Sequence, residues 1–126
     1  MYLRSFELAG EGQPDPDVQN RSLGQGWTGD EALAIAACCA LYAATPAAAI
    51  LAAVNHSGDS DSTGSITGNI IGACHRTAAL PDSWLDALDG SELVAQVAAD
   101  AAAEILEPPG REDTVPAEWW DSYPGW

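Results

Sequence analysis

The sequence predicts an all-α protein of about four to five helices, on two observations. Signals that begin helices recur along the chain, at Thr28-Gly29-Asp30-Glu31, Thr45-Pro46 and Ser91-Glu92, and an apolar stretch follows each of them. Strict alternation of apolar and polar residues, the pattern of a half-buried strand, is scarce. We therefore expect no sheet beyond a pair of short strands.

The first two helices are defined by how they start. Thr28 and Glu31 can form a capping box, in which the hydroxyl and the carboxylate bind the first unpaired amides, and helical spacing of apolar residues then continues to about residue 44. Thr45 precedes Pro46, and proline fits the first turn of a helix because it lacks an N–H. This second helix is expected to reach about Val54.

Three further helices are expected downstream. One covers about residues 62–75 and begins inside an acidic loop. A short helix covers about 81–88, with Trp84 as its anchor. The last covers about 91–106, and its apolar positions include Leu93, Val97 and Ile105.

The chain divides into three sections by composition. Residues 1–23 are polar, with several Gly and Pro, and are interpreted as an N-terminal arm or linker. Residues 24–106 form the helical domain, a size that can bury a usable core. Residues 107–126 form an acidic, tryptophan-rich tail, whose aromatic rings either dock in a groove or fold back loosely.

Charge excludes two classes of partner. The chain has four Arg, no Lys and 19 Asp and Glu residues, which give a formal net charge of −15. A field of this sign repels nucleic acid and anionic membranes, so we expect neither as a partner. An anionic ligand would need metal ions and helix N-termini to offset the charge.

The cysteines and the apolar segments indicate a cytoplasmic protein. Cys38 and Cys39 are adjacent and the total of three is odd, so a disulfide framework is not expected and the thiols are interpreted as buried and structural. No charged leader precedes an apolar core at the N-terminus, and the apolar run over 32–44 is too short to span a bilayer. Abundant Ala, with Arg in place of Lys, suggests a bacterial genome of high GC content.

The loop between the second and third predicted helices is the strongest candidate site. Asp59 and Asp61 alternate with serines, and Gly58 and Gly64 flank them. Alternate carboxylates in a tight loop can direct their oxygens at one hard cation such as Mg²⁺. A few side-chain oxygens cannot fill an octahedral shell, so water, substrate or other protein groups must complete it. The alternative is that both carboxylates merely cap the next helix.

Two other interpretations of this loop fail. An EF-hand needs a bidentate Glu at its twelfth position, which is Ile70 here. A phosphatase of the Asp-x-Asp-x-Thr kind needs its nucleophile to leave a buried parallel strand, which should be a continuous apolar run. Residues 55–58 read Asn-His-Ser-Gly and are not such a strand.

Three segments in register resemble the ADP-ribosylglycohydrolase family. They are the Gly-Gln-Gly-Trp loop with its following helix over 24–36, the acidic loop and small-residue helix over 58–73, and the closing helices over 80–93. The resemblance covers roughly residues 20–106. It implies an all-helical fold, a pair of Mg²⁺ ions, and hydrolysis of the bond between ADP-ribose and a modified side chain.

The resemblance also implies roles for individual residues. Asp59, Asp61 and Ser62 correspond to metal ligands, with Asp61 bridging the ions; the family more often has Thr at the position of Ser62. The residues implied to contact the substrate are Gly26, Trp27, Asn55 and Gly58. For Trp27 a second interpretation stays open, in which the indole is a hydrophobic staple for the helix behind it.

Half of the family's metal site has no counterpart in these residues. The other ligands come from a Thr-Asp-Asp segment in an N-terminal half, together with a glutamate, and no Thr-Asp-Asp occurs here. The chain therefore resembles a C-terminal portion, as part of a split or truncated enzyme, and is expected to be weak or inactive alone. The expected partners are an ADP-ribosylated protein or ADP-ribose, together with a complementary N-terminal chain or a second copy in a homo-oligomer. The alternative is a non-catalytic module that binds ADP-ribose or assembles with such a chain.

No catalytic residue can be assigned. His56 lies beside the acidic loop and is placed to orient it, while His75 is interpreted as a cation at a helix C-terminus. Gly64, Gly68 and Gly72 form a stripe on the third helix, where each glycine costs about 1 kcal/mol against Ala. The stripe favours either close packing of another helix or access of substrate to the metal loop.

Overall fold

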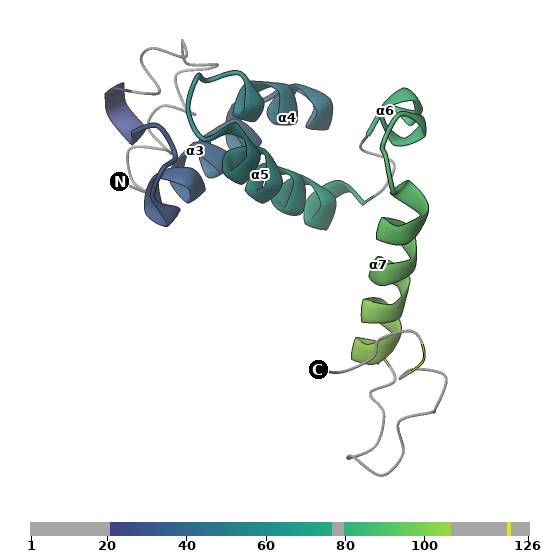
Figure 1. Ribbon diagram of the computed structural model, residues 1–126. Coiled ribbons are helices and arrows are strands. Elements are labelled where there is room, and N and C mark those ends of the chain that lie inside the picture. Colours follow the sequence, from purple (N-terminus) through teal and green to yellow (C-terminus); the bar gives the residue numbers. More distant parts are fainter. Residues whose placement is uncertain (1–20, 77–79, 107–120, 122–126) are drawn as a thin grey trace. The chain divides into compact units, whose positions relative to one another are not determined.

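The computed structural model describes residues 21–76, 80–106 and 121, and within these ranges every regular element is a helix (Figure 1). This confirms the predicted all-α class and agrees with a fragment of the ADP-ribosylglycohydrolase fold. The helices are α3 (Gly29–Tyr42), α4 (Pro46–Val54), α5 (Ser60–His75), α6 (Asp82–Asp86) and α7 (Ser91–Leu106). The N-terminal arm and nearly all of the C-terminal tail lie outside the described residues.

Helix boundaries agree best where a side chain caps the helix. Thr45 accepts a hydrogen bond from the amide of Ala48 at 3.2 Å, and Pro46 occupies the first turn of α4, as predicted. The start of α5 was predicted two residues too late. The carbonyl of Asp59 accepts a hydrogen bond from the amide of Thr63 at 3.1 Å, so the helix already includes Ser60 and the acidic positions after it.

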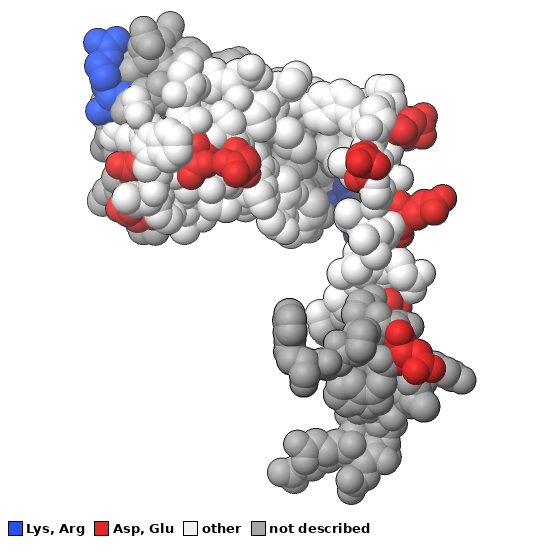
Figure 2. Space-filling model, viewed as in Figure 1, with Lys and Arg blue, Asp and Glu red and all other residues white. Residues whose placement is uncertain are grey.

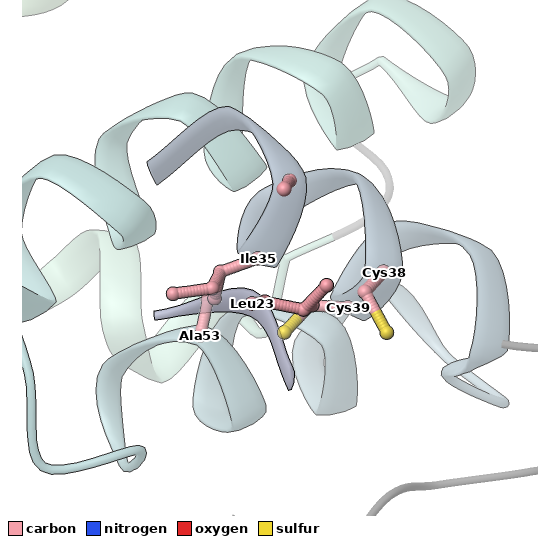
Figure 3. Packing of buried hydrophobic residues seen from close by; sticks show 6 residues of the cluster. Leu23, Ile35, Cys38, Cys39 and Ala53 are labelled. Carbon is pink, nitrogen blue, oxygen red and sulfur yellow. The ribbon is translucent and has the colours of Figure 1, made fainter. Parts of the chain in front are cut away.

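The chain divides into two compact units, residues 1–84 and 85–126. In the first, α3, α4 and α5 pack against one another in all three pairs. Its core contains Leu23 and side chains of α3 and α4: Leu23, Ala34, Ile35, Cys38, Cys39 and Ala53. Figure 3 labels five of them, all except Ala34. Helix α5 packs against both of the helices that supply this core.

The thiols are only partly as predicted. Cys38 and Cys39 are buried, but Cys74 is exposed near the end of α5. Burial raises the pKa of the Cys38 thiol to about 12, so it stays protonated and behaves as a small apolar side chain. The interpretation of all three as buried structural thiols is therefore wrong for Cys74.

The second unit is dominated by α7, in which no residue is buried. Its apolar side chains stand exposed: Leu93, Val94, Val97, Ile105 and Leu106. Figure 2 shows acidic side chains on the visible face of each unit. Within the part of the chain that the structure describes, no helix is long and apolar enough to cross a membrane.

Candidate functional site

A turn before α3 holds the loop that precedes α5. The amide of Asp59 donates to the carbonyl oxygen of Gln25 at 2.8 Å. A Cβ on Gly58 would collide with that same carbonyl, so the close approach requires glycine. A Cβ on Gly26 would lie 3.0 Å from the Cγ2 of Thr63. The structure thus brings the predicted residues Gly26, Gly58 and Asp59 together.

The turn itself is held by Glu31 of α3. Gly24 and Gly26 have positive φ values of 89° and 85°, a backbone region that favours glycine. The amide of Gly26 donates to Oε2 of Glu31 at 3.1 Å. The Glu31 carboxylate therefore fixes the Gly24–Gly26 turn and, through it, the carbonyl that binds the amide of Asp59.

The predicted capping box is wrong in its bonding. Thr28 is the N-cap residue of α3, but its side chain makes no capping hydrogen bond. Its hydroxyl instead donates to Oδ1 of Asp30 at 2.6 Å. Glu31 does reach back along the chain, yet it binds the amide of Gly26 rather than that of Thr28, because the left-handed turn brings the Gly26 amide closer.

A buried polar cluster connects α4, the loop and α5. His56 is 1% exposed and Thr63 is fully buried. The Thr63 hydroxyl lies 2.7 Å from the carbonyl oxygen of Ala53, 2.9 Å from that of Asp59 and 2.9 Å from Nε2 of His56. A hydroxyl carries one proton, which it donates to a carbonyl; it therefore accepts from Nε2–H of His56. Burial lowers the pKa of His56 despite the opposing effect of Asp59, which fits a neutral imidazole.

Threonines form much of the buried face of α5. Thr63, Thr67 and Ile71 are buried and recur every four residues. The Thr67 hydroxyl donates to the carbonyl oxygen of Thr63 at 2.7 Å, so the hydroxyls bond to backbone and the face can pack as if apolar. Sequence reasoning missed the structural role of Thr63 and Thr67, although their four-residue spacing with Ile71 was the available signal.

The paired carboxylates lie at the start of α5. Asp59 is the N-cap residue, but its side chain makes no capping hydrogen bond, so the capping alternative is wrong for this residue. Asp61 is exposed in the first turn. A hydrogen bond with the Asp59 side chain lowers the pKa of Asp61, and the backbone amides of Ser62 and Asp61 add to the effect. The two carboxyl groups therefore stand two residues apart at the start of α5, close enough for Asp59 to affect the pKa of Asp61.

This donor set fits part of a divalent-cation site. Two carboxylates within hydrogen-bond distance repel each other unless a proton or a cation lies between them. Carboxylate and hydroxyl oxygens are the ligands that Mg²⁺ accepts. In residues 21–76 and 80–106, however, no group of three His, Cys, Asp or Glu side chains could hold a metal. Asp59, Asp61 and Ser62 can thus supply one side of a shell that other oxygens must complete.

Two predicted substrate contacts differ in their surroundings. Trp27 is 68% exposed and its Nε1 donates to Oε1 of Gln25 at 3.1 Å, so the staple interpretation is wrong and the indole lies on the surface. The side-chain amide of Asn55 donates to the carbonyl oxygen of Leu51 at 2.6 Å and thereby closes α4. A contact of Asn55 with substrate stays a prediction.

The glycine stripe on α5 is only partly a packing device. A Cβ on Gly64 would collide with Cγ1 of Val54, so glycine lets α5 approach α4 here. A Cβ on Gly68 or Gly72 would meet no described atom within 4 Å beyond its own neighbourhood. Packing within the described residues therefore explains the first glycine and leaves the other two facing open space.

Comparison with known proteins identifies the family. A family model described as ADP-ribosylglycohydrolase matches residues 2–112, most of the chain and more than the motifs alone cover. This match places the all-helical domain, with its paired carboxylates at a helix start flanked by glycines, in a class of hydrolases. The chain belongs to the ADP-ribosylglycohydrolase family. No curated protein and no solved structure matches it.

Proposed function

We propose that this chain contributes one side of an Mg²⁺ site that hydrolyses ADP-ribosyl linkages on modified proteins. Family membership supports hydrolysis of the ADP-ribosylglycohydrolase type. The observation that carries the metal proposal is the pair of carboxylates, Asp59 and Asp61, at the N-terminus of α5, where the Asp59 side chain lowers the pKa of Asp61. Ser62 completes the proposed set, with Asp61 as the bridge between two ions.

The proposed ligands are held without the metal. The Asp59 backbone is bonded on both sides, by the carbonyl of Gln25 and by the amide of Thr63, so little ordering remains when a cation arrives. The free amides at the start of α5 favour negative charge beside them. When bound, Mg²⁺ would supply the positive charge that binds ribose hydroxyls and polarises the anomeric centre. It would also offset part of the net charge of −15.

Substrate recognition is proposed for the turn beside these ligands. Gly26 and Gly58 lie next to Asp59, and neither adds a side chain that would block a ribose. The exposed indole of Trp27 offers a flat apolar face to the adenine or ribose. Asn55 stands at the far end of the same loop, where its amide is already bonded to α4.

The remaining ligands are proposed to come from a second chain. The sequence has no Thr-Asp-Asp segment, and the described residues hold no third metal-ligating group near the pair. A complementary N-terminal half would supply the missing oxygens and the general base. Alone, the chain is expected to turn over ADP-ribosyl substrates very slowly. We propose a bacterial cytoplasm as its compartment, which the buried thiols of α3 support.

A non-catalytic role is the second candidate, and His56 favours it. His56 is the histidine nearest the loop, yet it is buried and bonded to Thr63, so it is poorly placed as a general base. A module that keeps the scaffold and part of the site could still bind ADP-ribose or assemble with a complete partner.

One experiment separates the two candidates. Turnover of ADP-ribosyl-arginine and ADP-ribosyl-serine peptides is measured with Mg²⁺ for this chain alone and mixed with a Thr-Asp-Asp half from the same family, alongside calorimetric titration with ADP-ribose. Turnover that appears only on mixing, and disappears with Asp61→Asn but not with the exposed control Asp82→Asn, supports the split hydrolase. ADP-ribose binding without turnover in either case supports the binding module. Robust turnover by the purified monomer contradicts both.

A further inference from the structure

The buried pair of His56 and Thr63 carries an inference about how the loop is positioned. We propose that these residues are positioning residues, which hold the Asp59 and Asp61 carboxyl groups in the arrangement that receives a divalent cation. The inference rests on the proposed function of those carboxylates. It concerns residues that neither touch the cation nor reach the substrate, because His56 is 1% exposed and Thr63 is fully buried.

The geometry places Thr63 at a junction. Its hydroxyl lies between the end of α4 and the start of α5, 2.7 Å from the carbonyl oxygen of Ala53 and 2.9 Å from that of Asp59, and these two acceptors share its single proton. Nε2 of His56 reaches the same oxygen from inside the loop, at 2.9 Å. One oxygen atom therefore connects the three segments that surround Asp59.

The Asp59 backbone is fixed from both directions as a result. Its amide is bonded to Gln25 at 2.8 Å, and its carbonyl accepts from the amide of Thr63 at 3.1 Å besides facing the Thr63 hydroxyl. Only the side-chain torsions of Asp59 are left to vary. Asp61 follows two residues later in the first turn of the same helix, so the backbone that Thr63 fixes also places its carboxylate. Groups that orient metal ligands in this way commonly change metal affinity when they are removed.

Paired substitutions can distinguish the positioning role from a purely structural role of these two residues. Thr63→Val keeps the shape but leaves the Nε2–H of His56 buried without its acceptor, which destabilises the fold. Replacing both partners, with His56→Leu and Thr63→Val together, removes that unpaired group and is expected to recover much of the lost stability. The double variant still lacks the junction, so it should not recover metal affinity.

The test uses Mn²⁺ as the probe on the full 126-residue chain. Affinity is measured by electron paramagnetic resonance, and amide hydrogen exchange is followed at Asp59 and across α3. Thr63→Val and the double variant are expected to weaken Mn²⁺ binding by about 10-fold to 100-fold. Both variants should speed amide hydrogen exchange at Asp59 more than at Cys38. Thr63→Ser retains the hydroxyl, so it should keep Mn²⁺ affinity and amide exchange close to the wild-type values.

Thr67→Val is the matched control. Thr67 is equally buried one turn further along α5, and its hydroxyl bonds the carbonyl of Thr63 rather than the loop. It should leave Mn²⁺ affinity at the wild-type value. Equal losses for the Thr63 and Thr67 variants, or affinity recovered in the double variant, would overturn the positioning role.

The outcome for the wild-type chain separates this inference from the proposed function. If the isolated wild type binds no Mn²⁺, Asp59, Asp61 and Ser62 do not hold a cation without the missing ligands, and hydrogen exchange alone decides the positioning role. Faster exchange confined to the loop in Thr63→Val then supports it. Uniform acceleration through α3 and the loop overturns it.

Discussion

The carbonyl oxygen of Gln25 accepts the amide proton of Asp59 at 2.8 Å, which ties a turn before α3 to the first residue of the proposed metal loop. Gly58 makes this approach possible, because any side chain there would strike the same carbonyl. The placement of a candidate ligand thus depends on a residue 34 positions earlier in the chain. The first predictions concern this contact.

Gly58→Ala should destabilise the protein and weaken metal binding together. The added methyl collides with backbone, which cannot move as a flexible side chain would, and overpacking of this kind costs about 1–3 kcal/mol. The loop must then move away from Gln25 and take Asp59 with it. Denaturant unfolding and Mn²⁺ titration provide the measurements. An alanine variant with unchanged unfolding free energy would show that the contact is not tight in solution.

Gly72→Ala should have the opposite effect on stability. The position is helical and exposed, and a Cβ there meets no neighbour, so the free energy of unfolding should rise by up to about 1 kcal/mol. If a second chain covers this face, the same substitution should weaken association with it. Chemical denaturation and measurement of mass in solution separate the two effects. A destabilised Gly72→Ala monomer would mean that an unseen neighbour already occupies this space.

Glu31→Ala should loosen the turn that carries Gln25. The substitution removes the acceptor of the Gly26 amide, a hydrogen bond to a charged group in a partly buried site, at a cost of about 1.5–3 kcal/mol. Hydrogen exchange at Gly26 and Asp59 should quicken. Asp30→Ala is the control, since that carboxylate lies exposed on the same turn of α3 and bonds the hydroxyl of Thr28 rather than the amide of Gly26. Equal exchange at Gly26 in both variants would contradict a specific role for Glu31.

Sequence patterns predicted the elements of this fold far better than the contacts between them. The start of α4 was predictable because Thr45 and Pro46 act on their own helix. The bonding of Glu31 was not, because its partner depends on a left-handed turn that a local pattern does not reveal. The capping signal at Thr28 was therefore correct in position and wrong in chemistry.

The same distinction between local patterns and contacts between elements applies to the candidate site. Spacing and the family resemblance predicted that Asp59, Asp61 and Ser62 would face one point, within reach of a shared Mg²⁺, and this stays a prediction. The role of Thr63 escaped prediction, because its partners on α4 and in the loop are set only when the two helices pack. Asn55 shows the same limit of sequence-based prediction. The last carbonyl groups of α4 have no partner within the helix, and the side-chain amide of Asn55 donates to one of them.

Asp61→Ala should reduce Mn²⁺ affinity more than Ser62→Ala. A carboxylate contributes charge as well as an oxygen, whereas the hydroxyl contributes an oxygen alone. Asp61 is exposed, so the substitution should change the unfolding free energy by no more than about 0.5 kcal/mol. Electron paramagnetic resonance and denaturation on the same samples give both quantities. Equal losses from the two substitutions would remove Asp61 from its proposed bridging position.

Stability should fall as the pH drops from neutrality through the ordinary His pKa near 6.5, because of His56. Burial lowers the pKa of the folded imidazole, so below about pH 6.5 the unfolded chain binds a proton that the folded chain does not. The contribution of His56 to the free energy of unfolding is complete above the His56 pKa of the unfolded chain. It is lost as the pH falls toward the lower His56 pKa of the folded protein. Asp61, whose pKa is also lowered, acts in the same direction but below its ordinary value of 3.8, outside this window.

The measurement is the unfolding free energy by denaturant between about pH 7.5 and pH 5, a range that lies above the ordinary carboxyl pKa values. The His56→Leu/Thr63→Val variant should lose the slope, because no titrating group remains at the junction. His75→Gln should keep it, since His75 is exposed in the last turn of α5 and bears no part in the buried cluster. A wild-type profile that is flat across this range would show that His56 accepts a proton in the folded protein as easily as in the unfolded chain.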